Sequence, residues 1–184
     1  MQFICDLRFG PDDETMGSIL HDLGTEFGLD KSIINGLENL SKSHMGIYRH
    51  EGIENGLVRL KEIATGEINL CFSTSKYLGS INEIWFVRTV QNLDSIYDYK
   101  IVLITPFILT ESTESDWIEF YKRQSIILDK GVDGNAYLNF MKYIPNSTYW
   151  HNYIMDGFLK YEPNSIYLKG IPDVVGSKPH EVTT

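Results

Sequence analysis

The spacing of apolar residues changes twice along this chain of 184 residues, and that change constrains the fold more than any single motif. Before residue 44, apolar residues recur at intervals of three and four, as on one face of an amphipathic helix. Between residues 45 and 109 they alternate with polar residues, as in half-buried strands, and after residue 110 the helical spacing returns. The pattern predicts an α+β fold in which helices precede and follow a region of strands.

The region 1–44 is predicted to form a helical hairpin. Asp12 or Asp13 can cap the first helix, Gly28 ends it, and Asp30 caps the second helix. The two apolar stripes give the pair one apolar side, which we expect to pack on the strand region. The stripe residues are Met16, Ile19, Leu20, Leu23 and Phe27 in the first helix, and Ile33, Ile34, Leu37 and Leu40 in the second.

The region 45–109 is predicted to form five consecutive antiparallel strands, a β-meander. Asn55-Gly56 lies between the first two apolar runs, and this dipeptide favours a two-residue hairpin turn because both residues tolerate positive φ. The last run, 101–109, is apolar on both faces and is interpreted as one buried strand. Five short strands leave exposed edges unless their sheet curls, so we expect a small barrel-like sheet.

The region 110–170 is predicted to be mainly helical. Ser112 or Thr113 can cap its first helix, and residues 147–161 have the spacing of a later one. The final segment, 171–184, contains two prolines and is expected to be an extended tail. Because the helical regions at the two ends are too small to have cores of their own, the whole chain 1–184 is predicted to be a single domain.

Acidic residues outnumber basic ones, with 25 Asp and Glu against 16 Lys and Arg and a net charge of −9. A surface of this sign repels phosphate groups, which argues against nucleic acid and anionic lipid as partners. It favours another protein as the partner, and a basic one most easily, although acidity also serves solubility alone.

Cysteine usage and the lack of long apolar segments predict a cytoplasmic location. Cys5 and Cys71 are too few and too far apart for a disulfide framework, so we expect both to be free thiols. The N-terminus lacks the basic and apolar regions of a signal peptide. No apolar run approaches the ~20 residues needed to cross a bilayer, so no membrane association is expected.

Three histidines, His44, His50 and His151, are the candidate ligands for a zinc ion with an open position for water. His44 and His50 flank the first strand of the predicted meander, and His151 lies near the start of an aromatic helix. No pair has the i, i+4 spacing that places two ligands on one helical face. We therefore expect no metal, no other cofactor and no catalytic residue.

The most unusual local feature is the run Tyr-Trp-His-Asn-Tyr at residues 149–153. Trp150 and Tyr153 share the apolar stripe of the predicted helix, which is typical of core residues. Tyr149 and Asn152 fall off that stripe, and with His151 they offer an aromatic and hydrogen-bonding patch of the kind that is common at recognition surfaces. The predicted binding residues are therefore Tyr149, His151 and Asn152.

Several segments resemble a small β-domain of bacterial proteins without an assigned activity. In the strand region they are 46–52 (GIYRHEG), 58–62 (VRLKE), 65–67 (TGE) and 83–88 (EIWFVR), and nearer the C-terminus 149–150 (YW), 170–173 (GIPD) and 178–180 (KPH). The resemblance extends over most of the chain and implies a bacterial origin. It brings no catalytic residue with it.

Three functions remain open. The first is a non-catalytic protein-binding or accessory module of a bacterial cytoplasmic system, which the lack of catalytic motifs favours. The second is an acidic immunity or inhibitor protein whose carboxylates neutralise a basic toxin or enzyme. The third is a hydrolase or metal enzyme built on His44, His50 and His151, which requires these side chains to converge in a pocket. The partner's identity and the oligomeric state stay open.

Overall fold

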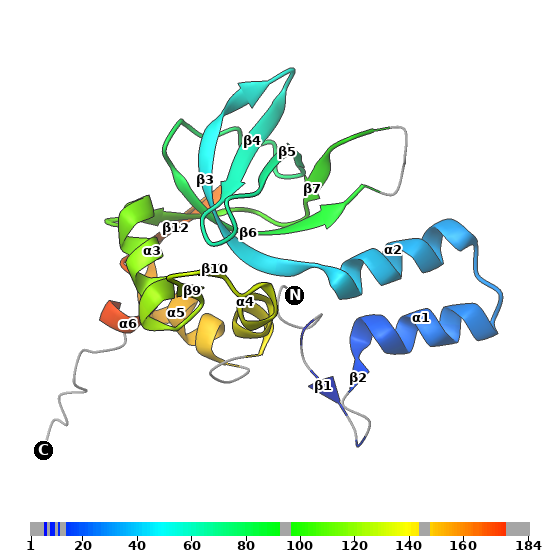
Figure 1. Ribbon diagram of the computed structural model, residues 1–184. Coiled ribbons are helices and arrows are strands. Elements are labelled where there is room, and N and C mark those ends of the chain that lie inside the picture. Colours follow the sequence, from blue (N-terminus) through cyan, green and yellow to red (C-terminus); the bar gives the residue numbers. More distant parts are fainter. Residues whose placement is uncertain are drawn as a thin grey trace, which may run out of the picture.

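The protein has a mixed α+β architecture, shown in Figure 1 as a computed structural model. The part of the chain that the structure describes comprises residues 6, 8, 9, 11, 14–92, 97–143 and 148–175. It begins with two short paired strands and a helical hairpin: β1 (Arg8–Phe9), β2 (Glu14–Thr15), α1 (Met16–Glu26) and α2 (Lys31–Lys42).

A closed five-stranded barrel forms the centre of the molecule. Its strands in chain order are β3 (His44–Glu54), β4 (Leu57–Glu62), β5 (Ile68–Ser73), β6 (Ile84–Gln91) and β7 (Lys100–Val102). β4 lies between β3 and β5 as the antiparallel neighbour of both, and β6 pairs with the other edge of β3. β7 closes the barrel because it pairs antiparallel with β6 and parallel with β5.

The predicted antiparallel meander is confirmed only in part. The hairpin at Asn55-Gly56 joins β3 and β4, with φ angles of 51° and 78°. After β5 the order departs from a meander, because β6 returns to β3 instead of pairing with β5. The expected single strand 101–109 is two strands, β7 and β8 (Phe107–Thr110), separated by a segment that contains Pro106. Proline has no N–H for a sheet ladder, so it favours a break at this point.

Three strands extend the barrel sheet beyond β6. β8 pairs antiparallel with β6, β12 (Ser165–Lys169) pairs in parallel with β8, and β11 (Phe158–Glu162) pairs antiparallel with β12. The predicted helix 147–161 is therefore wrong beyond residue 157, where α5 (Tyr149–Gly157) ends. Backbone pairing with β12 outweighs the helical spacing of the last residues, and leaves the side chains of Phe158 and Tyr161 exposed.

The remaining C-terminal elements are α3 (Glu114–Arg123), the paired strands β9 (Ile127–Leu128) and β10 (Gly131–Val132), α4 (Gly134–Lys142) and α6 (Pro172–Val175). α6 replaces the first part of the expected extended tail, and residues 176–184 lie outside the described residues.

Two of the predicted helix caps lie within the described residues. Thr113 caps α3 in a reciprocal capping box with Asp116, and Asp30 caps α2. The expected caps Asp12 and Asp13 lie outside the described residues, and α1 is capped by Thr15.

The core consists of two clusters on the two faces of the barrel wall. On β6, Trp85 and Val87 join the cluster inside the barrel, whereas Ile84 and Phe86 join the cluster under α3, α4 and α5. Successive side chains of a strand point to opposite faces. β6 is therefore buried on both faces, because the side chains of one face lie inside the barrel and helices cover those of the other face.

Cys71 is a free cysteine of the barrel interior, and burial raises the pKa of its thiol to about 12. The other expected free thiol, Cys5, lies outside the described residues. Of the helices within the described part of the chain, none combines a membrane-spanning length with an apolar sequence.

Candidate functional site

The helical hairpin forms through local capping at the start of each helix. Thr15 Oγ1 accepts a hydrogen bond from Ser18 N at 3.2 Å, and Ser18 Oγ accepts one from Thr15 N at 2.9 Å. Asp30 caps α2 by accepting a hydrogen bond from Ser32 N at 2.8 Å. Each cap satisfies backbone N–H groups that have no partner within the helix.

Gly17 and Gly24 let α2 pack closely against one side of α1. A Cβ atom at Gly17 would lie 3.1 Å from Ser41 Cβ, and one at Gly24 would lie 3.1 Å from Leu29 Cδ1. The two glycines are seven positions apart and therefore lie on the same side of the helix. They are also the buried residues of α1, so the contact between the helices uses the glycine side.

The apolar stripe of α1 is not the side that contacts α2. At 100° per residue, it lies roughly a quarter turn from the glycines. Ile19 is half-buried, and the other stripe residues are exposed by fractions that range from 38% at Met16 to 77% at Phe27. Leu29 in the connecting turn and Ile33 in the first turn of α2 continue this exposed surface. We call it the hairpin face, and it consists of Met16, Leu20, Leu23, Phe27, Leu29 and Ile33.

The hairpin is attached to the rest of the molecule near the C-terminal end of α2. The buried Arg88 of β6 donates hydrogen bonds to the backbone O (3.0 Å) and Oγ (2.9 Å) of Ser43, and forms an ion pair with Asp6. Lys142 Nζ donates to Ser41 O at 2.7 Å. No residue of α2 is buried, and Figure 1 shows the hairpin extending away from α3, α5 and α6. The expected packing of the apolar side on the strand region therefore does not hold for the exposed stripe residues of α1, whereas Ile34, Leu37 and Leu40 of the α2 stripe are half-buried.

An acidic flank borders the hairpin face. Asp22 and Glu26 lie one turn apart on the side of α1 opposite the glycines, in its C-terminal half. The helix dipole disfavours negative charge at this end, and the last turn of α1 contains no basic residue. Between residues 14 and 43 there are five carboxylates and two lysines. The exposed apolar surface therefore has a negatively charged border.

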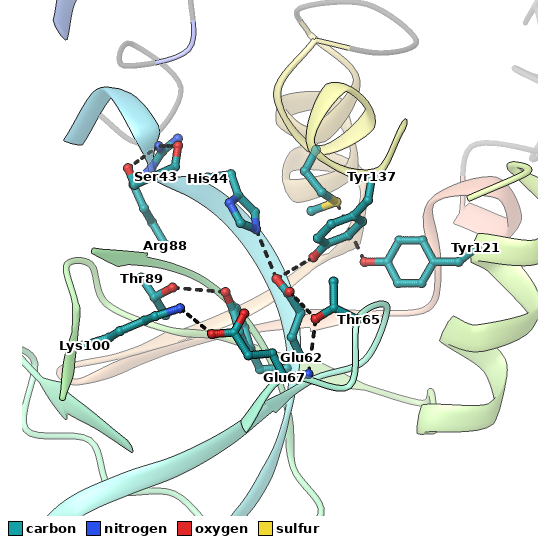
Figure 2. A network of polar contacts seen from close by, with 12 residues as sticks. Ser43, His44, Glu62, Thr65, Glu67, Arg88, Thr89, Lys100, Tyr121 and Tyr137 are labelled. Atoms are coloured by element: carbon teal, nitrogen blue, oxygen red, sulfur yellow. Dashed lines mark hydrogen bonds and ion pairs between the residues drawn. The ribbon is translucent and has the colours of Figure 1, made fainter. Parts of the chain in front are cut away.

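A second polar feature is the buried carboxylate of Glu62, at the end of β4, which Figure 2 shows with the side chains around it. Its exposed fraction is 4%. Oε1 accepts hydrogen bonds from His44 Nε2 at 3.1 Å and from Tyr137 Oη at 2.8 Å, and Oε2 accepts one from Thr65 Oγ1 at 2.6 Å. These partners come from β3, α4 and the turn after β4, so the carboxylate links the helical layer to the barrel.

The environment of Glu62 keeps it ionised. Burial by itself raises the pKa of Glu62, but the hydrogen bond and charge of His44 and the hydrogen bonds from Thr65 and Tyr137 lower the pKa below its ordinary value. Burial raises the pKa of Tyr137, so its hydroxyl stays neutral and can donate. A Cβ atom at Gly46 would lie 2.8 Å from Glu62 Oε1, so the backbone of β3 covers the carboxylate. A satisfied and covered carboxylate of this kind stabilises the fold.

We expect the contribution of Glu62 to stability to disappear in acid. Because its folded pKa lies below the ordinary value, the ionised form stabilises the protein above the unfolded pKa of about 4.3, and this stabilisation is lost as the pH falls through the folded pKa. The difference in free energy of unfolding between the wild type and Glu62→Gln should shrink as the pH falls below about 5.5. Urea titrations of both proteins at several pH values measure this difference, and a pH-independent difference would contradict the assignment.

A groove of about 360 Å³ lies beside β5 and β7, and Arg59 and Lys100 are the cations in its lining. Lys100 Nζ donates to Glu67 Oε1 at 2.9 Å, and Arg59 lies within 4.0 Å of carboxylate oxygens of Glu51 and Glu54. The two cations of the groove are therefore already paired with carboxylates of the same chain. This pairing leaves little positive charge for an anionic ligand.

The structure does not bring His44, His50 and His151 together. His44 and His50 are at different positions on β3, about 20 Å apart at 3.3 Å per residue. His50 Nδ1 accepts from Gly52 N at 3.1 Å, so Nε2 carries the hydrogen and donates to Leu78 O at 2.8 Å. His151 is exposed on α5. Within the described residues, no group of three or more His, Cys, Asp or Glu side chains is placed to hold a metal ion.

The predicted binding residues on α5 occupy different environments. His151 and Asn152 are exposed, whereas Tyr149 is half-buried and its ring contacts Phe140 and Trp150. Burial raises the pKa of Tyr149 to about 12. The structure therefore leaves His151 and Asn152 accessible at the surface and packs Tyr149 against the core.

The sequence signal for the hairpin face was present in the spacing of its apolar residues, but that spacing did not show whether the chain itself covers them. For Glu62 no signal was available, because its partners come from three separate segments. The chain matches no protein-family model, no curated protein and no solved structure, so its own residues carry the functional argument.

Proposed function

We propose that this chain is a non-catalytic protein-binding module and that the hairpin face is its binding surface. The observation that carries the proposal is the exposure of six large apolar side chains on one projecting helical hairpin. Their exposed surface is on the order of 500 Å², and apolar patches of that size on a protein surface commonly mark interaction sites.

The way the hairpin is built supports this role. Amphipathic helices in proteins gain most of their stability from burial of their apolar face, not from intrinsic helix propensity. Here the contact between α1 and α2 buries the glycine side of α1, and α2 has no buried residue. A partner that covers the hairpin face would supply the missing burial and stabilise the hairpin by binding to it.

The other candidate sites favour binding over catalysis. Glu62 has hydrogen-bond partners on both carboxylate oxygens and is covered by the backbone of β3. The cations of the groove at Arg59 and Lys100 are paired with carboxylates, and the three candidate histidines lie apart. The alternative role, an acidic inhibitor of a basic protein, would use the same hairpin with its acidic flank.

We expect the variant Leu20→Ser/Leu23→Ser/Phe27→Ser to lose a partner that the wild-type protein captures from an extract of the source cells. The matched control is Met155→Ser/Tyr161→Ser, which removes exposed apolar side chains from α5 and β11. Each exposed substitution should change the free energy of unfolding by about 0.5 kcal/mol or less. Affinity capture followed by mass spectrometry, with thermal melts of every variant, measures both effects. Equal capture by the triple variant and the wild type would contradict the proposed surface.

A second binding site on α5, at Tyr149, His151 and Asn152, remains a proposal that the same capture experiment can test. Asn152→Ala removes an exposed side chain from this surface without disturbing the contacts of Tyr149 with the core. Loss of the captured partner in Asn152→Ala, and its retention in the hairpin variant, would move the binding surface from the hairpin to α5.

A further inference from the structure

We infer that the occupant of the hairpin face is an amphipathic helix of another protein, with an apolar stripe bordered by Lys or Arg side chains. This inference rests on the proposed binding function and adds the chemical class of the partner. It follows from the shape of the hairpin face and from the charge beside it.

The shape of the surface favours a helix. The apolar residues of α1 and α2 are joined at the connecting turn by Leu29, so two neighbouring helices contribute to one surface. A third helix can place its side-chain ridge in the groove between two packed helices, which is a common mode of peptide recognition. The helices have 11 and 12 residues and are about 16–18 Å long, which matches roughly three turns of a bound helix.

The charge beside the surface specifies basic residues in the partner. Asp22 and Glu26 form a like-charge i, i+4 pair, which destabilises a helix by a small amount. They also lie toward the negative end of the α1 dipole, where the last turn has no basic side chain, and Asp22 Oδ1 contacts His21 Nδ1 of the same helix at 3.0 Å. A Lys or Arg that borders the partner's apolar stripe would remove both unfavourable terms. The net charge of −9 would attract such a partner over a longer range.

The same charges argue against two other occupants. A second copy of this chain would place another acidic flank and another net charge of −9 against the first. A membrane surface that carries anionic lipid would be repelled by the acidic flank. A basic helix is the occupant for which apolar burial and electrostatic attraction act together.

Three synthetic peptides of about 14 residues, four helical turns, test the inference. The first is a Leu/Lys amphipathic helix, the second a scrambled sequence of the same composition, and the third a Leu/Glu amphipathic helix. Binding of labelled peptide to the full chain is measured by fluorescence anisotropy at low and at moderate salt. We expect the Leu/Lys helix to bind at least about tenfold more tightly than the other two, and to bind more weakly as salt increases.

Paired variants assign the binding to the two parts of the surface. Asp22→Asn/Glu26→Gln should weaken binding of the Leu/Lys helix several-fold and reduce its dependence on salt. Leu23→Ser/Phe27→Ser should weaken it about tenfold or more, because both side chains lose apolar burial against the peptide. The control Glu119→Gln/Asp156→Asn, which neutralises exposed acids on α3 and α5, should leave the affinity unchanged.

Each other outcome overturns the inference in a recognisable way. The inference that the partner is a basic helix is wrong if the scrambled peptide binds equally well, or if Asp22→Asn/Glu26→Gln has no effect on binding. Neither result contradicts the capture of a partner by the hairpin face. A dimer mass in light scattering that reverts to a monomer in Leu23→Ser/Phe27→Ser identifies a second copy as the occupant. If the hairpin variants change neither peptide binding nor capture, the proposed function fails as well.

Discussion

Trp150→Ala is expected to lower the free energy of unfolding by about 3–5 kcal/mol, as truncation of a buried Trp to Ala does. Trp150 is 3% exposed, and its ring centroid lies 5.0 Å from that of Phe86 and 5.6 Å from that of Phe140. Its Nε1 donates a hydrogen bond to the backbone O of Phe140 at 3.2 Å. Alanine would leave a cavity between α5, α4 and β6 and would leave this buried carbonyl without its donor.

Met155→Ala is the matched control for Trp150→Ala, because it shortens a large apolar side chain on the same helix. Met155 is 65% exposed, so its replacement should change the free energy of unfolding by about 0.5 kcal/mol or less. For a protein of this size, Trp150→Ala should lower the melting temperature by roughly 6–20 °C. Thermal and chemical melts of both variants measure the difference. A Trp150→Ala protein that melts with the Met155→Ala protein would show that α5 is not part of the core.

Glu62→Ala is expected to be destabilising to a similar degree, by about 3–5 kcal/mol, because one partner of a buried charged network is removed. The change deletes the acceptor for His44 Nε2, Tyr137 Oη and Thr65 Oγ1. Burial keeps the hydroxyl of Tyr137 neutral, and it would become a donor without an acceptor. Each buried polar group left in this way costs about 1–3 kcal/mol.

Glu67→Ala provides the comparison for Glu62→Ala. Glu67 follows the same turn but is exposed and accepts from Lys100 Nζ at 2.9 Å, and an exposed ion pair contributes about 1 kcal/mol or less. A double-mutant cycle then isolates the contact with α4. Adding Tyr137→Phe to Glu62→Ala should cost less than the sum of the single changes, because it removes the donor left without an acceptor. Simple additivity in urea titrations would show that the Glu62–Tyr137 hydrogen bond contributes little.

The sequence was informative about the helices because their signals are local. The stripe from Met16 to Phe27 and the caps at Asp30 and Thr113 lie within single elements, and the structure has helices at these places. The hairpin at Asn55-Gly56 is equally local, because the backbone preferences of two adjacent residues select the turn.

The order of the strands in the barrel could not be predicted from local signals. β7 joins the sheet by pairing with β5 and β6, and such pairing depends on where the intervening chain travels. Residues 158–162 are a second case in which local spacing did not predict strand pairing. Their spacing continues that of α5, but they form β11 because β12 offers a backbone edge for pairing. Local spacing cannot register a competing hydrogen-bond partner that is supplied by another segment.

The candidate site likewise has features that the sequence determined and features that only the tertiary structure decided. Apolar spacing in residues 16–27 by itself determined that α1 has an apolar side and where that side lies. Only the tertiary structure decided that the glycine side packs on α2 and that the apolar side faces outward. The tertiary structure likewise placed His44, Thr65 and Tyr137 around Glu62. The physical reason is that periodicity states which side of an element is apolar, whereas burial depends on which distant surface covers that side.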